Sequence, residues 1–248
     1  MTAPGSVRRI SAGLLLVLAV AAGCGTDPNL KSEATTTEAK HNMTQGKIAA
    51  DTGGAATTAL RRPVVLFFGT SLTAGAGLEP DQAFPALVEK IADSAGVPIK
   101  AVNAGLSGET TAGAVRRIDW VLRTPADVIV IEVGANDALR GLSTAAARAN
   151  LQTLVAAVKK RQPRARIVLV QMEAPPNFGS AYTRSFRAIY GEIATQENLT
   201  LIPFLLDGVA GVARYNQPDG IHPNVAGERI VADNVWKGIE PVVRSIAD

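Results

Sequence analysis

The run Asp127-Val-Ile-Val-Ile-Glu-Val133 is the clearest strand signal in the chain, and Gly134 follows it directly. Five of its seven residues are aliphatic and branched at Cβ, which is typical of a strand with both faces buried. Four other short apolar runs are predicted as strands, and segments with helical patterns separate all five. These runs cover residues 64–68, 99–102, 166–170 and 199–204.

The helical segments fill the gaps between the predicted strands. Asp81 and Asn224 are expected as N-cap residues, and Gly96 and Pro163 mark points where helices stop. Buried strands that alternate with helices predict an α/β fold, in which helices cover both faces of a parallel sheet and crossovers are right-handed. The helices are expected at residues 81–95, 110–122, 144–161, 181–196 and 224–246.

The N-terminal sequence predicts export. Arg8 and Arg9 precede an uncharged, mostly apolar run that ends before Cys24, and this order is typical of an export signal, here residues 1–23. The apolar run is shorter than the roughly 20 residues that a membrane span needs. The segment from Ala21 to Cys24 resembles the lipobox of bacterial lipoproteins, which implies a lipid on Cys24 that anchors the protein in the bacterial cell envelope. An ordinary secretory signal with an incidental cysteine is the alternative.

The remaining chain divides into a polar tether and a folded domain. Residues 24–60 are rich in Thr, Ala and Gly and lack sustained periodicity, so they are expected to remain a flexible tether. Residues 61–248 have a size that suits one domain with its own apolar core.

Composition excludes several classes of function. The formal net charge is +3, and residues 1–23 hold two arginines and no acid, so the remainder carries 23 − 22 = +1. Because no cluster of basic residues with interleaved aromatics is present, nucleic acid is not an expected partner. One cysteine permits no internal disulfide, and a single histidine in the domain leaves too few ligands for a usual zinc site. No metal or other cofactor is therefore expected.

Four polar motifs follow predicted strands or precede the last helix. Since the carboxyl ends of parallel strands meet at one edge of a sheet, these motifs are expected to converge there. They are Gly69-Thr70-Ser71-Leu72, Asn103-Ala-Gly-Leu-Ser-Gly108, Gly134-Ala-Asn-Asp137 and Asp219-Gly-Ile-His-Pro223.

Each motif has a structural and a chemical interpretation. Ser71 is either a helix N-cap or a nucleophile. Gly108 is a turn glycine, a backbone donor to an oxyanion, or part of a phosphate site. Asn136 either caps a loop or donates its amide to an oxyanion. Asp219 and His222 form either a solvent-facing turn or the acid and base of a triad, because the tight turn between them brings the carboxylate to Nδ1.

The four motifs occur in the order found in SGNH (GDSL-type) hydrolases, and the chain resembles this family over residues 63–245. Within it, the chain resembles the bacterial branch of multifunctional esterases, thioesterases and lysophospholipases. The resemblance implies a three-layer α/β/α sandwich with a five-stranded parallel sheet of flavodoxin-like type. It also implies that Ser71 is the nucleophile, His222 the base and Asp219 its orienting acid. The oxyanion hole would then comprise the Ser71 amide, Gly108 and Asn136.

One residue departs from the family pattern. The family usually has aspartate before the serine, whereas this chain has Thr70. Either the threonine hydroxyl replaces the carboxylate with a hydrogen bond, or the serine loop is looser and the enzyme slower.

The loop at residues 172–179 follows the fourth predicted strand. It is expected to form a wall of the site with Phe178 beside an acyl chain, or else to be a plain surface loop.

The expected function is hydrolysis of small carboxylic (acyl) esters through an acyl-enzyme, without a cofactor. Alternatives are an acetyl-carbohydrate esterase, a catalytically weakened envelope lipoprotein that binds acylated ligands, and a binder of phosphate ligands that uses residues 105–111. The loss of activity on replacing Ser71 would separate the enzymes from the binding proteins.

Overall fold

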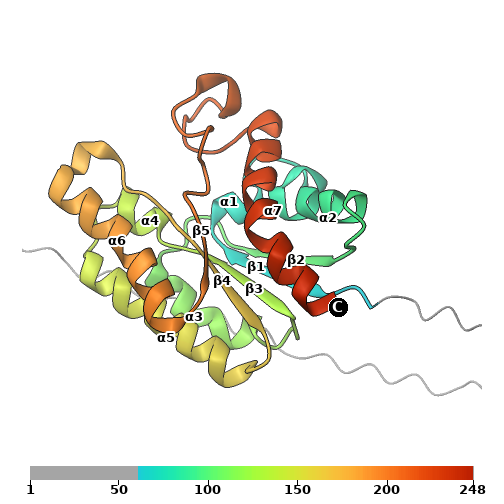
Figure 1. Ribbon diagram of the computed structural model, residues 1–248. Coiled ribbons are helices and arrows are strands. Elements are labelled where there is room, and N and C mark those ends of the chain that lie inside the picture. The colour runs from blue at the N-terminus through green and yellow to red at the C-terminus, as the bar shows by residue number, and fades with distance from the viewer. Residues whose placement is uncertain (1–60, 248) are drawn as a thin grey trace, which may run out of the picture. The chain divides into compact units, whose positions relative to one another are not determined.

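Five parallel strands form a sheet at the centre of the computed structural model, which describes residues 61–247 of the chain (Figure 1). The strand order is β2-β1-β3-β4-β5, and each neighbouring pair is parallel. This is the order of flavodoxin-like doubly wound sheets, so the predicted fold class is confirmed. The strands are β1 (Val64–Gly69), β2 (Lys100–Gly105), β3 (Val128–Glu132), β4 (Arg166–Val170) and β5 (Thr200–Ile202).

Helices cover both faces of this sheet. In Figure 1, α2 and α7 lie over one face, and α3, α5 and α6 lie over the other, which makes the sheet the middle layer of an α/β/α sandwich. A helix able to span a membrane is absent from the part of the chain that the structure describes. The α-helices are α1 (Ser71–Ala74), α2 (Phe84–Ser94), α3 (Thr111–Val121), α4 (Ala135–Leu139), α5 (Thr144–Arg161), α6 (Ser180–Glu197) and α7 (Val225–Ala247). The 3-10 turns are η1 (Pro80–Gln82), η2 (Pro176–Phe178) and η3 (Ala213–Tyr215).

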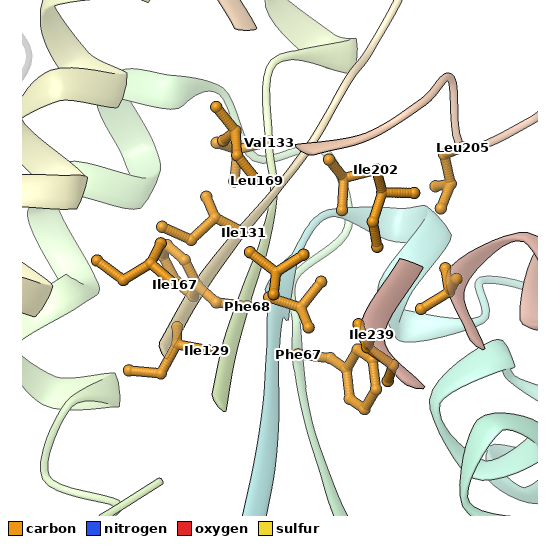
Figure 2. Close-up of a cluster of buried hydrophobic side chains, with 14 of the residues drawn as sticks. Phe67, Phe68, Ile129, Ile131, Val133, Ile167, Leu169, Ile202, Leu205 and Ile239 are labelled. Carbon is orange, nitrogen blue, oxygen red and sulfur yellow. The ribbon is translucent and has the colours of Figure 1, made fainter. Parts of the chain in front are cut away.

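The core consists of apolar side chains that alternate between the two faces of the sheet (Figure 2). The register places Phe68, Ile131 and Leu169 side by side on the face toward α3, α5 and α6. Phe67 points to the opposite face, where its ring meets that of Phe84 from α2 edge-on at a centroid distance of 5.6 Å. All five side chains are at most 1% exposed, so both layers of helices are attached by apolar burial.

Some predicted boundaries were wrong. Helix α2 begins at Phe84 rather than at Asp81, because residues 80–82 form a separate 3-10 turn closed by a capping box between Glu79 and Gln82. Asp81 therefore lies in that turn and is not the N-cap of α2. By contrast, Asn224 does cap α7, since its side-chain oxygen accepts the amides of Ala226 and Gly227 at 3.0 and 3.1 Å.

The ends of two strands also differ from the prediction. Strand β2 extends to Gly105, which pairs with Gly69 at the end of β1, so Asn103 lies within the strand and not in the loop after it. Strand β5 ends at Ile202 rather than at residue 204. Pro203 follows it, and a proline has no amide to continue the ladder.

The layer of α2 and α7 contains a buried acid, Glu228. Its side chain lies in the first turn of α7, is 1% exposed, and accepts the amide of Phe84 at the start of α2 at 2.7 Å. The pKa of Glu228 is raised from 4.5 to about 8, chiefly by burial and in smaller part by the nearby Glu132 carboxyl group, whereas the Phe84 amide opposes the shift. The acid thus satisfies an amide at a helix start while it resists ionisation.

This burial makes stability depend on pH. A carboxyl group whose pKa is raised on folding contributes stability below its unfolded value of 4.5 and loses it as pH rises through about 8. We expect Glu228→Gln, which keeps the acceptor and cannot ionise, to match the wild-type melting temperature at pH 4 and to exceed it at pH 9. Thermal denaturation followed by circular dichroism measures both. A variant that is equally less stable at both pH values would contradict this role of the charge.

Candidate active site

Ser71, His222 and Asp219 form a continuous chain of hydrogen bonds. Ser71 opens α1 directly after β1, and its Oγ lies 2.9 Å from Nε2 of His222. The other ring nitrogen of His222, Nδ1, lies 2.7 Å from Oδ2 of Asp219. The structure therefore brings together the three residues that the sequence analysis selected as nucleophile, base and orienting acid.

Asp219 is held by its own loop. Its Oδ1 accepts the amides of Ile221 and His222 at 2.9 and 3.0 Å. Gly220, which directly follows Asp219, has φ of +70°, a conformation that favours glycine. The bond to the His222 ring lowers the pKa of Asp219 to about 2, with help from the two amides. Asp219 is thus a carboxylate at neutral pH. It selects the tautomer with hydrogen on Nδ1, which leaves Nε2 free to accept the Ser71 proton.

The histidine loop and the serine loop are joined by Gln217. Its Nε2 donates to the carbonyl oxygens of Ala76 and Pro223 at 2.7 and 2.9 Å. Its backbone amide donates to the carbonyl of His222 at 2.7 Å. Gly77 allows the close approach, because a Cβ there would lie 2.3 Å from Oε1 of Gln217. Sequence reasoning missed Gln217, since its contact with Ala76 joins residues 141 positions apart.

Gly108 and Asn136 line the same cavity as Ser71 and His222, which has a volume of about 640 Å³. Gly108 has φ of +77°, and its carbonyl accepts Arg140 Nη2 at 3.1 Å. Beside Asn136, the buried carboxylate of Asp137 accepts the amide and hydroxyl of Thr111, each at 2.7 Å. The loops that carry the two candidate oxyanion donors are thereby tied to each other. Asp137 therefore has a structural role.

Thr70 forms the hydrogen bond that was expected if its hydroxyl replaces the aspartate usual in the family. Its hydroxyl lies 3.1 Å from both carboxylate oxygens of Glu132, and its amide donates to Glu132 at 2.9 Å. The amide and hydroxyl of Thr73 donate to the same carboxylate at 3.3 and 2.8 Å. Glu132 is 1% exposed, and burial raises its pKa to about 7 against the opposing effect of these donors. The serine loop is therefore braced from the end of β3.

Glu132 was not selected from the sequence, although a signal was present. It is the one charged residue inside the apolar run of residues 128–133, and a charge in a strand buried on both faces needs partners.

A second set of stabilising contacts, made by Arg117 on α3, was also missed. Arg117 donates to Glu109 through Nε at 2.7 and 2.8 Å and to the Gly69 carbonyl at 3.1 Å. Its guanidinium carbon lies 4.4 Å from the ring centroid of Phe68. Arg117 thus connects the end of β1 to the Gly108 loop.

The loop after β4 forms one wall of the cavity, as predicted. Met172, Pro175 and Pro176 line the cavity, whereas Phe178 does not. The Phe178 ring packs instead 5.4 Å from that of Tyr182 and against Gly141, where a Cβ would lie 2.7 Å from it. Phe178 therefore supports the wall from outside rather than flanking a bound acyl chain.

Other candidate sites lack this chemistry. Within residues 61–247, no group of three or more His, Cys, Asp or Glu side chains could hold a metal ion. A hollow of about 750 Å³ near Arg61, Asp127 and Arg164 contains none of the triad residues. Cys24, the predicted signal and the predicted tether lie outside the described residues.

Comparison with known proteins agrees with this geometry. Residues 67–230 match the family described as GDSL-like lipase/acylhydrolase. Esterase TesA of Pseudomonas aeruginosa is 39% identical over 181 residues, which are 72% of this chain and 89% of that protein. Thioesterase 1/protease 1/lysophospholipase L1 of Escherichia coli K12 is 32% identical over 72% of this chain and 84% of its own length. The crystal structure of esterase EstA from Pseudoalteromonas sp., inhibited by monoethylphosphonate, has a TM-score of 0.69 at 30% identity and covers 73% of this chain and 99% of that one. The chain belongs to the GDSL-like lipase/acylhydrolase family.

Proposed function

We propose that the chain is a serine ester hydrolase that cleaves carboxylic esters through an acyl-enzyme on Ser71. The observation that carries the proposal is the chain of contacts from Ser71 Oγ to His222 at 2.9 Å and from His222 to Asp219 at 2.7 Å. The family and its relatives, an esterase and a thioesterase/lysophospholipase by name, support the same chemistry.

The first step forms the acyl-enzyme. Ser71 Oγ bonds to the carbonyl carbon of the ester while its proton passes to Nε2 of His222. The negative charge that develops on the carbonyl oxygen is stabilised by the Ser71 and Gly108 amides and the Asn136 side chain. The carbon–oxygen bond to the alcohol then breaks, and the alcohol leaves with the proton from His222.

The second step releases the acid. Water occupies the place of the departed alcohol, gives a proton to Nε2 of His222 and bonds to the acyl carbon. The bond to Ser71 Oγ breaks, and Oγ recovers the proton from the imidazole. Asp219 stays ionised throughout, because its pKa of about 2 lies far below the working pH, and it stabilises the imidazolium at each transfer.

Replacement of Ser71 tests this proposal directly. We expect Ser71→Ala to lower kcat for p-nitrophenyl acetate by about 10³-fold or more, because the nucleophile is lost while the fold is kept. The exposed Ser94 on α2 provides the matched control, and Ser94→Ala should keep the wild-type rate. Turnover by Ser71→Ala that equals wild type would end the proposal in favour of a protein that binds acylated ligands.

Replacement of Asn136 tests the oxyanion assignment separately. We expect Asn136→Ala to reduce kcat for the same ester by about 10²–10³-fold, with KM nearly unchanged, because the amide donates only to the transition-state oxyanion. Steady-state kinetics separate the two parameters. A rise in KM at constant kcat would assign Asn136 to substrate binding instead.

The substrate classes that we propose follow from the residues that line the cavity and from the names of the relatives. Most of the side chains that line the cavity are apolar, among them Leu139, Met172 and Leu206, which suits the acyl part of an ester. The name of the Escherichia coli relative mentions thioesters and lysophospholipids, and an arylesterase of Vibrio mimicus, 32% identical over 69% of this chain, adds arylesters. Acetylated carbohydrates are disfavoured by this lining, since few polar groups are present to bind a sugar.

We also propose that the chain is exported and lipid-anchored. Support comes from the order of Arg8-Arg9, the apolar run and the segment Ala21-Ala22-Gly23-Cys24. The thiol of Cys24 is the acceptor of the lipid, so Cys24→Ser should move the protein from the membrane fraction to the soluble fraction of the expressing bacterium. Fractionation followed by immunoblotting measures the shift. Equal partitioning of Cys24→Ser and wild type would refute the anchor.

A further inference from the structure

The exposed apolar side chains of the domain gather around the active-site cavity. Seven large hydrophobic side chains are exposed in the part of the chain that the structure describes, and six of them either line this cavity or lie within three residues of a residue that does. The seventh, Trp120, lies near the end of α3, toward the opposite edge of the sheet. The six, called the rim below, are Leu106, Leu139, Leu142, Phe178, Ile221 and Val225, with exposed fractions from 36% to 50%.

The rim is continuous with the cavity. Leu139 and Ile221 line the cavity as well as reaching solvent. Leu106 directly precedes two lining residues, Ser107 and Gly108.

The remaining rim residues come from neighbouring segments of the same edge. Leu142 follows Gly141, against which the Phe178 ring packs. The Leu142 carbonyl accepts the hydroxyl of Tyr182 at 2.8 Å, and the Tyr182 ring also contacts that of Phe178. Val225 opens α7 three residues after His222. The rim thus comes from the segments that follow four strands, β2, β3, β4 and β5.

The charged groups beside the mouth have hydrogen-bond partners within the domain. Glu173, which lines the cavity, pairs with Arg187 at 3.3 Å. Arg140 donates to the Gly108 carbonyl, and Asp219 is bonded to His222. An apolar surface whose nearby charged groups already have such partners favours an uncharged apolar partner over an acidic or basic one.

We propose that the rim docks the domain onto the surface of a lipid aggregate, so that the ester of a lipid in that surface reaches Ser71 without its acyl chain crossing bulk water. The inference rests on the proposed function, because the lipid surface supplies the ester that Ser71 is proposed to cleave. Transfer of each methylene into water costs free energy, and a continuous apolar path from the aggregate to the cavity avoids this cost. Apolar side chains at the boundary of head groups and acyl chains are the means by which proteins lie on membranes.

A second copy of the chain is a less suitable occupant. Six side chains, each at most 50% exposed, are few beside the roughly 20–30 residues that each partner contributes to a stable interface. A partner placed there would also close the cavity that contains Ser71. A lipid surface, by contrast, presents its ester to the mouth.

Vesicle binding tests the rim. The double variant Leu106→Ser/Leu142→Ser changes two rim residues that do not line the cavity, and Trp120→Ser is the control at the exposed apolar residue outside the rim. Each is compared in the full-length chain with Cys24→Ser, so that no lipid on the protein contributes. We expect the rim variant to partition about tenfold less onto phosphatidylcholine vesicles in flotation, and the Trp120 variant to match its parent.

Hydrolysis provides the second readout. The rim variant should cleave dissolved p-nitrophenyl acetate within about twofold of its parent, yet lose about tenfold in rate on p-nitrophenyl decanoate carried in the vesicles. Failure of the parent protein to bind vesicles, equal loss of both activities, or a dimer in gel filtration that the rim variant dissolves would overturn the proposal. Vesicle binding with no Ser71-dependent hydrolysis would instead refute the proposed function and leave the rim as a lipid-binding surface.

Discussion

A buried carboxylate determines where the nucleophile lies. Glu132 ends the central strand β3, and the amides and hydroxyls of Thr70 and Thr73 converge on it. An ion taken out of water is costly unless hydrogen bonds replace the lost hydration. Four donors on one turn of chain provide that replacement, and in return the turn is fixed to the sheet. Gly69 allows the approach, since a Cβ there would lie 2.6 Å from Oε2 of Glu132. The position of Ser71 is thus a consequence of satisfying a buried carboxyl group inside the core.

The other loops of the site are held by the same kind of link. Arg117 joins the end of β1 to Glu109, Asp137 joins the loop after β3 to the start of α3, and Gln217 joins the histidine loop to the serine loop. Each link connects segments far apart in the sequence, and together they form a frame beneath the triad. A network whose members are all satisfied holds its groups in one arrangement, which is the condition for a preorganised site. The arrangement of the candidate site therefore rests on polar contacts made by residues outside the proposed triad.

The sequence predicted the sheet, and it selected three residues that the fold brings together, because both depend on local patterns. Apolar runs such as residues 128–132 are recognisable without knowledge of their partners, and the motifs around Ser71 and His222 are short. The links named above were missed because their partners are separated by up to 141 residues, and pairing over such distances is decided by the packed fold. Two other predictions were wrong for a related reason. The start of α2 depends on a capping box, and the direction of the Phe178 ring depends on the space beside Gly141.

The point at which the chain enters the domain has a mechanical consequence. Arg61 precedes the amino end of β1, whereas Ser71 follows its carboxyl end, so the chain joins the domain at the edge opposite the mouth. The 36 residues from 25 to 60 can span at most about 120 Å when fully extended. A domain of this size is roughly 40 Å across. If Cys24 carries the proposed lipid, this length exceeds the width of the domain and allows the mouth to face the bilayer that holds the anchor, whereas a much shorter stretch would restrict it to targets on the far side.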